Sequence, residues 1–329
     1  MRVAVLGVGR MGQLHARVLR EQPAVSELLV ADADAERAAG VAAEIGATHV
    51  PSVEEAVERA EAIVIVAATD AHAALVRAGA QRGIPVFCEK PLAAELDETK
   101  ELVELVERTG IALQVGFQRR FDPAYREARR LVESGELGRL YLVRLAGHDH
   151  LPPPESYIPV SGGFFRDSSI HDFDLLRWLS GEEVEEVYAD GAVHLPQFGR
   201  HDDVDTVAVV MRTTGGTLAV LGGTRHDPVG YDVRTELFGS QDSVSMGLTE
   251  RTPQRSLEPG AAPPVDPWQS FLTRFEEAYR QELAVFLRVA VGEIPSPCTA
   301  RDGLEAMRIA VAATRSRREH RPVRLEEVA

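Results

Sequence analysis

The sequence predicts two domains in an α/β chain: a doubly wound parallel sheet over residues 1–119, then an α+β domain with a mainly antiparallel sheet over residues 120–329. Three observations lead to this prediction. A length of 329 residues suits two domains that each bury a core. Short apolar runs alternate with helical patterns in the first part of the chain. In the second part, strands follow one another through short turns, which indicates antiparallel pairing.

The first part alternates strands and helices, the pattern of a doubly wound sheet. Its short apolar runs are typical of parallel strands buried on both faces, and they lie at Val3–Leu6, Leu28–Ala31, Ile63–Ala67, Val86–Cys88 and Ala112–Phe117. The helical patterns lie at Met11–Arg20, Ala35–Ile45, Val53–Ala60, Ala71–Arg82 and Leu96–Arg108. Glycines close three of these helices, at Gly46, Gly83 and Gly110.

The second part mixes helices with consecutive strands. Helices are predicted at Pro123–Ser134, Asp167–Leu179, Phe271–Val291 and Ala300–Ser316. Strands are predicted at Leu140–Gly147, Val184–Val193, Val204–Arg212, Thr217–Thr224 and Asp232–Phe238. The residues Thr213–Gly216 suit a tight hairpin between two of these strands. The Pro-, Gly- and Ala-rich stretch Arg251–Pro267 is predicted to be a loop.

Composition excludes several classes of function. With 36 basic and 51 acidic residues, the formal net charge is −15, and nucleic acids and anionic membranes are poor partners for such a chain. Cys88 and Cys298 are too few for a disulfide framework or a cysteine-based zinc site. Neither a signal peptide nor a membrane-spanning apolar stretch is recognisable, so we expect a cytoplasmic protein.

The residues Gly7-Val8-Gly9-Arg10-Met11-Gly12 form a GxGxxG motif between a strand and a helix, the context of a Rossmann dinucleotide site. Gly7 would permit the tight turn, Gly9 the approach of a pyrophosphate, and Gly12 close packing of helix on strand. Asp32 lies 20 residues beyond Gly12, where a carboxylate binds ribose hydroxyls and repels a 2′-phosphate. This favours NAD and leaves room for NADP. A helix cap is the alternative role for Asp32, although Asp34 could equally cap that helix.

Lys90 follows a predicted buried strand and precedes Pro91. The carboxyl ends of parallel strands line the ligand crevice in such a sheet. An ammonium group there can orient a substrate hydroxyl and stabilise developing negative charge. A solvated surface lysine is the alternative.

Asp167 and His171 are four residues apart in a predicted helix, so both can project from one face. Histidine is suited to accept a hydroxyl proton, and Asp167 could orient the imidazole or bind a neighbouring hydroxyl. Alternatively, Asp167 is an N-cap and His171 a half-buried structural histidine. Asp174 could support His171, whereas Asp172 is expected to point elsewhere.

Two further polar clusters could hold a metal, namely His148–His150 and His201–Asp205. Both adjoin loops and turns, where polar residues collect, so we assign no metal site to this chain. Cys88 is expected to be a small core residue.

The chain resembles the Gfo/Idh/MocA oxidoreductases, most closely the inositol 2-dehydrogenase branch. The matching stretches cover nearly the whole chain and include VAVLGVGRMGQLHARVL, ATDAHAALV, EKPLA, GFQRRFDPAY, VSGGFFRDSSIHDFDLLRWL and YDVRTELFGS. The resemblance implies an N-terminal Rossmann domain and a C-terminal domain with an open sheet. In this family that sheet commonly forms a subunit interface, so we expect a homo-oligomer, a tetramer or a dimer.

The resemblance also assigns roles to individual residues. It implies that Lys90, Asp167 and His171 are catalytic and contact the substrate. The family's cofactor positions fall on the glycine motif with Arg10 and Met11, and on Asp32, Ala68, Thr69, His72, Glu89 and Gln118. Tyr231 matches a position near the polyol, and the loop His148–Ile158 faces the substrate in relatives.

We therefore predict NAD-dependent oxidation of a ring hydroxyl of a cyclic polyol, with myo-inositol and scyllo-inosose as the best substrate and product. The nearer alternative is another dehydrogenase of the family that acts on scyllo-inositol, an aldose or a deoxy sugar. The more distant alternative is a non-catalytic NAD-binding sensor, which the joint presence of Lys90, Asp167 and His171 disfavours.

Overall fold

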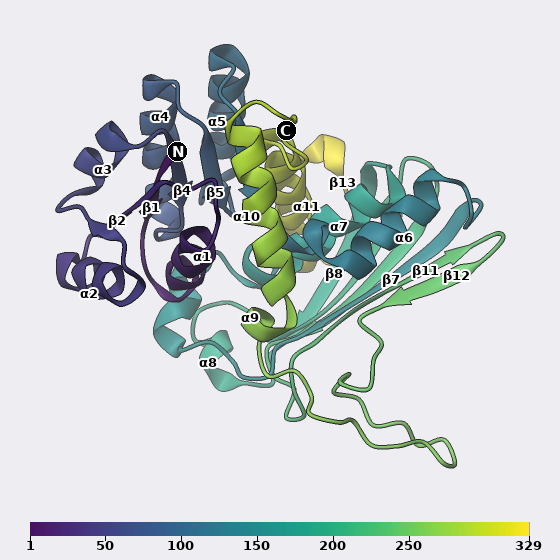
Figure 1. Ribbon diagram of the computed structural model, residues 1–329. Helices are drawn as coiled ribbons and strands as arrows, with labels where there is room; N and C mark the ends of the chain where they lie inside the picture. The colour runs from purple at the N-terminus through teal and green to yellow at the C-terminus, as the bar shows by residue number, and fades with distance from the viewer. Residues whose placement is uncertain (329) are drawn as a thin grey trace. The chain divides into compact units, whose positions relative to one another are not determined.

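The computed structural model describes residues 1–328, which form two compact units, each with its own sheet (Figure 1). The first unit comprises Met1–Gln118 and Glu277–Glu305. The second comprises Arg119–Glu276 and the chain from Ala306 onward.

The sheet of the first unit is parallel throughout, in the order β3-β2-β1-β4-β5-β6. Its strands are β1 (Arg2–Leu6), β2 (Glu27–Ala31), β3 (Thr48–His49), β4 (Ala62–Ile65), β5 (Val86–Glu89) and β6 (Leu113–Gly116). The order changes direction between β1 and β4, and ligands of open α/β sheets bind at the carboxyl ends of strands beside such a point. The predicted doubly wound sheet is confirmed. Only the two-residue edge strand β3 was not predicted among the strands of this unit.

Capping residues close in the sequence set where helices of the first unit begin and end. Asp34 caps α2 by accepting a hydrogen bond from the Arg37 amide at 3.0 Å. The predicted glycine stops are confirmed, because Gly46, Gly83 and Gly110 all adopt the left-handed conformation after their helices. These helices are α1 (Arg10–Arg20), α2 (Ala35–Ile45), α3 (Val53–Arg59), α4 (Thr69–Arg82) and α5 (Leu96–Thr109).

A helix from late in the sequence, α10 (Glu276–Ala290), completes the core of the first unit (Figure 1). Its Leu283, Phe286 and Leu287 are buried in one apolar cluster with residues of β1, β2, β4 and β5. The ring of Phe286 meets that of Phe87 at 5.7 Å between centroids, edge to face. The first unit is therefore built from two segments that are far apart in the chain.

The sheet of the second unit has seven strands in the order β12-β11-β7-β10-β9-β8-β13. All neighbours pair antiparallel except β7 and β10, which pair parallel. The strands are β7 (Leu140–His148), β8 (Val184–Ala192), β9 (Thr206–Thr213), β10 (Leu218–Thr224), β11 (Asp232–Gly239), β12 (Ser243–Met246) and β13 (Val323–Arg324). The mainly antiparallel sheet and the β9–β10 hairpin are confirmed. The short edge strands β12 and β13 were not predicted.

Two of the predicted helices of the chain differ from the structure. The helix predicted at Asp167–Leu179 is an α-helix, α7, only over Ile170–Ser180, and the residues Phe165–Ser169 before it form a π-helical turn, η3. The helix predicted at Phe271–Val291 is interrupted at Phe275, which separates α9 (Phe271–Arg274) from α10.

The remaining helices belong wholly or largely to the second unit. They are the 3-10 turns η1 (Gln118–Phe121), η2 (Glu155–Val160) and η4 (Leu325–Glu327), with α6 (Pro123–Glu133), α8 (Pro196–Gly199) and α11 (Ala300–Glu319). Helix α7 packs against α6 and β7. Throughout residues 1–328, no helix combines the length and the apolar character that crossing a membrane requires.

Candidate cofactor and active site

The turn between β1 and α1 can accommodate only glycine at two of its positions. Gly7 has φ +95°, and a Cβ there would lie 2.5 Å from the Cα of Ala67. A Cβ on Gly12 would lie 2.0 Å from the carbonyl oxygen of Gly7. Gly9, the N-cap of α1, faces open space, and no side chain caps the helix. The turn thus presents the first backbone turn of α1 as a place where an anionic group can bind.

Asp32 lies at the end of β2, is 8% exposed and faces the same turn. Its carboxylate accepts hydrogen bonds from the Val8 amide at 2.6 Å and from the Arg37 guanidinium at 2.6 Å. Burial raises the pKa of Asp32, but the hydrogen bonds from Arg37, Val8 and Asp34 outweigh burial and hold the pKa below its ordinary value. Because Asp34 caps α2, the alternative role of Asp32 as the helix cap is wrong.

Lys90 is half-buried and follows directly after β5, as predicted. The Lys90–Pro91 peptide bond is cis. His72 on α4 is fully buried beneath this turn, with Nδ1 2.8 Å from the Pro91 carbonyl oxygen and Nε2 3.1 Å from that of Ala67. Burial lowers the pKa of His72. His72 therefore joins the turn after β5 to the turn that carries Ala68 and Thr69 at the start of α4.

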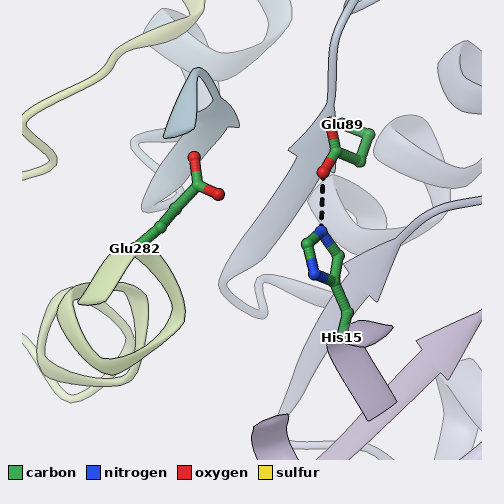
Figure 2. A group of neighbouring side chains, drawn as sticks. All are labelled: His15, Glu89 and Glu282. Carbon is green, nitrogen blue, oxygen red and sulfur yellow. Dashed lines mark hydrogen bonds and ion pairs between the residues drawn. The ribbon is translucent and has the colours of Figure 1, made fainter. Parts of the chain in front are cut away.

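Glu89, the residue before Lys90, is held from below by a buried histidine (Figure 2). His15 Nε2 on α1 lies 2.6 Å from Glu89 Oε1, and the amide of Lys90 donates to Glu89 Oε2 at 3.3 Å. Glu282 of α10 reaches toward the pair, so that one histidine nitrogen and two carboxylate oxygens lie within 4.8 Å of one another. Sequence reasoning missed His15 and Glu282, although each is a polar residue on the buried face of an amphipathic helix, which is a usable signal.

In the second unit, Asp167 lies just before α7 and His171 lies within its first turn, and both are half-buried. Asp167 lies in the π-helical turn. The Asp167 carboxylate accepts from the Tyr157 hydroxyl at 3.0 Å on one oxygen and from the Arg225 guanidinium at 2.7 Å on the other. Neither partner was singled out from the sequence.

Two buried ion pairs hold α7 to the turn after Gln118. Arg119 binds Asp172 at 2.5 Å, and Arg120 binds both oxygens of Asp174 at 2.8 and 2.5 Å. All four side chains are nearly inaccessible to solvent. The carboxylate of Asp174 is thus occupied by Arg120, a role that was not predicted.

Gln118 and Tyr231, which the family resemblance implies lie near the cofactor and the polyol, are both buried. The Tyr231 amide donates to the Trp268 carbonyl oxygen at 2.6 Å, and burial raises the pKa of the Tyr231 hydroxyl.

Residues of the polar clusters His148–His150 and His201–Asp205 are engaged in hydrogen bonds with other segments of the second unit. His148 Nδ1 lies 3.0 Å from the Thr224 hydroxyl oxygen, and His150 Nδ1 lies 3.0 Å from the Asp227 carbonyl oxygen. Asp205 accepts from the amides of His194 and Leu195, each at 2.6 Å.

Comparison with known protein families decides the identity of the chain. Residues 1–117 match the model described as "Oxidoreductase family, NAD-binding Rossmann fold", and residues 125–245 match the model of the GFO/IDH/MocA C-terminal domain. The chain belongs to the Gfo/Idh/MocA oxidoreductase family. The first unit of this Gfo/Idh/MocA protein is accordingly an NAD-binding Rossmann domain.

The relatives cover nearly the full length of this Gfo/Idh/MocA oxidoreductase. A myo-inositol dehydrogenase of Streptomyces leeuwenhoekii is 41% identical, covering 96% of this chain and 97% of the relative. The crystal structure of a probable dehydrogenase from Thermotoga maritima superposes with a TM-score of 0.94 at 34% identity, covering 100% of both chains. A scyllo-inositol dehydrogenase from Lactobacillus casei, solved with NAD(H) and scyllo-inositol bound, gives a TM-score of 0.90 at 26% identity over 99% of both chains.

Proposed function

We propose that this protein oxidises a ring hydroxyl of a cyclic polyol with NAD, and that myo-inositol is its substrate. The observation that carries the proposal is the 41% identity, over nearly the whole chain, to a myo-inositol dehydrogenase. The presence of Lys90, Asp167 and His171 supports it, because they supply a cation, a carboxylate and a base suited to alcohol oxidation.

The residues of the first unit fit NAD. The open face at Gly9 and the uncapped start of α1 suit a pyrophosphate. The buried carboxylate of Asp32 suits the adenosine ribose and disfavours a 2′-phosphate. We propose further cofactor contacts from Arg10, Met11, Ala68, Thr69, His72, Glu89 and Gln118.

In the proposed reaction, bound NAD supplies the hydride acceptor. His171 accepts the hydroxyl proton, since an imidazole is the side-chain base best matched to neutral pH. The Lys90 ammonium orients the substrate oxygen and stabilises the negative charge that develops on it. Asp167 orients the imidazole and binds a neighbouring hydroxyl, and Tyr231 lies near the polyol.

A second candidate substrate is scyllo-inositol, which the Lactobacillus casei enzyme binds. It differs from myo-inositol in the configuration of one ring carbon and requires the same acid–base groups. Aldoses and deoxy sugars are further candidates, and we propose that residues 148–158 determine the specificity of the enzyme among these substrates.

The test is reduced-cofactor formation by the purified protein with NAD or NADP. The panel comprises myo-inositol, scyllo-inositol, D-chiro-inositol, glucose and xylose. Turnover concentrated on myo-inositol with NAD is the expected result. A preference for an aldose would change the proposed substrate and keep the proposed mechanism. Binding of NAD with no oxidation of any compound in the panel would favour a non-catalytic sensor.

We further propose that the protein is a homo-oligomer whose copies meet through the exposed face of the second sheet. Tyr188, Val210 and Val220 are directly paired across β8, β9 and β10 and are 39%, 48% and 41% exposed. Leu218 on β10 is also exposed, and so is Tyr141 on the neighbouring strand β7. An apolar row of this kind on a sheet face is typical of a surface covered by another chain.

We expect Val210→Lys to shift the protein to a smaller species, because it places a charge in the middle of the apolar row. Light scattering coupled to gel filtration measures the mass. The control is Val291→Lys, since Val291 is 63% exposed directly after α10 and belongs to the first unit. A wild-type monomer, or an unchanged mass in Val210→Lys, would contradict the proposed interface.

A further inference from the structure

Arg225, directly after β10, is a buried cation at a position where strand alternation places apolar residues. Ala219, Leu221 and Gly223 are all buried on alternate positions of β10, and Arg225 continues the series at 5% exposure. An arginine there requires carboxylate partners, because burying an uncompensated charge is costly.

Arg225 has two carboxylate partners from different segments. One terminal nitrogen donates to Asp167 Oδ2 at 2.7 Å, and the other donates to Asp149 Oδ2 at 3.1 Å. The guanidinium carbon lies 4.8 Å from the centre of the Phe164 ring, a stacking distance. One cation therefore joins Asp167, at the start of the helical segment of His171, to the loop that follows β7.

Backbone hydrogen bonds hold the main chain of both Arg225 and Asp149 in place. The Arg225 amide donates to the Asp205 carbonyl oxygen at 2.7 Å, and the Asp149 amide donates to that of Thr224 at 2.9 Å. Burial raises the pKa of Asp149, whereas the guanidinium of Arg225 lowers it. Burial therefore destabilises the charged form of Asp149, and the ion pair with Arg225 offsets part of that cost.

We propose that Arg225 is a positioning residue: it holds the Asp167 carboxylate in place for the reaction and couples it to the loop of Asp149. This inference rests on the proposed function, in which Asp167 orients His171. With Tyr157 bound to Oδ1 and Arg225 to Oδ2, both Asp167 oxygens have fixed directions. The planar guanidinium reaches two carboxylates at once, which a lysine ammonium at the same position would do poorly.

The test compares Arg225→Gln and Arg225→Lys with the wild type, measuring kcat and KM for inositol and for NAD. We expect Arg225→Gln to lower kcat on the order of 100-fold, because a misplaced catalytic group costs about that much. KM for NAD should not change, and Arg225→Lys should recover part of kcat by restoring the charge. A wild-type kcat in a folded Arg225→Gln protein would overturn the inference.

The matched control is Arg177→Gln. Arg177 lies near the far end of α7, is also largely buried, and binds Glu183 through two hydrogen bonds at 2.6 and 2.7 Å. It should cost stability and leave kcat unchanged. If Arg225→Gln does not fold, Arg225→Lys decides: a reduced kcat with an unchanged KM for NAD supports the inference, and wild-type kinetics overturn it.

A measurement that does not depend on catalytic turnover can test this inference separately from the proposed function. The carboxyl carbon resonance of Asp167, assigned through Asp167→Asn, reports its titration. The groups that face this carboxylate include the guanidinium of Arg225, the Tyr157 hydroxyl and the Asp149 carboxylate, together with the His171 imidazole, which Asp167 orients in the proposed function. Loss of the cation should move the titration to higher pH. An unmoved titration overturns the inference, whereas a moved one with no cyclitol oxidised by the wild type overturns only the proposed function.

Discussion

We expect the Lys90→Ala protein to bind NAD as the wild type does and to oxidise inositol on the order of 100-fold more slowly, or worse. The reason is position. Lys90 follows β5 at the carboxyl end of a parallel strand, and its ammonium is the group that we propose stabilises the developing charge on oxygen. Cofactor fluorescence measures binding of reduced NAD, and initial rates measure turnover.

The chain supplies its own control for this experiment. Lys90 and Lys100 are its two lysines, and Lys100 is paired with Asp97 at 2.8 Å on the surface of α5. Lys100→Ala should keep wild-type kcat. Wild-type turnover in a Lys90→Ala protein that still binds NAD would remove Lys90 from the active site.

The largest stability effect is expected at the buried pair of Arg120 and Asp174. Arg120→Met leaves the Asp174 carboxylate buried with its main cationic partner gone, and we expect a loss of about 3–5 kcal/mol in the free energy of unfolding. Both side chains are almost completely inaccessible, 5% and 2% exposed, so solvent cannot replace the lost partner. Urea unfolding followed by circular dichroism measures the effect.

The double variant Arg120→Met with Asp174→Leu is the informative comparison. In the double variant the Asp174 carboxylate is gone together with Arg120, so no uncompensated charge stays buried. The double variant should therefore be more stable than Arg120→Met alone. If Arg120→Met were as stable as the wild type, water would have to reach the Asp174 carboxylate readily, which would contradict the burial of that side chain.

Local patterns were sufficient to predict the parallel sheet of the first unit and the glycine turn after β1. The glycine spacing, the strand before it and the helix after it are all contained within a dozen residues, and Gly7 and Gly12 have the geometry that this spacing predicts. The position of Lys90 after a strand follows from the same alternation of elements. Such features need no information from distant parts of the chain.

The start of α7 was not predictable in the same way. The four-residue spacing of Asp167 and His171 indicates one face of an α-helix, but Asp167 lies in a π-helical turn, where the residues per turn differ. Periodicity over five residues cannot distinguish the two helices, because the choice depends on what packs around the turn.

Contacts between distant residues were missed for a related reason. Arg119 and Asp172 are 53 residues apart, and Arg225 and Asp167 are 58 apart. The parallel pairing of β10 with β7 likewise joins strands that are separated by two others in the sequence. Only the alternation along β10 marks Arg225 as buried in advance, and it does not name the partners.

The split construction of the first unit bears on how the protein is made. A ribosome completes Met1–Gln118 long before it reaches Leu283, Phe286 and Leu287, which fill the core of that unit. Domains of nascent chains generally fold in order of synthesis. Here the first unit in the sequence must wait for nearly the whole of the second to emerge, and until then its unfilled apolar surface is a natural site for a chaperone.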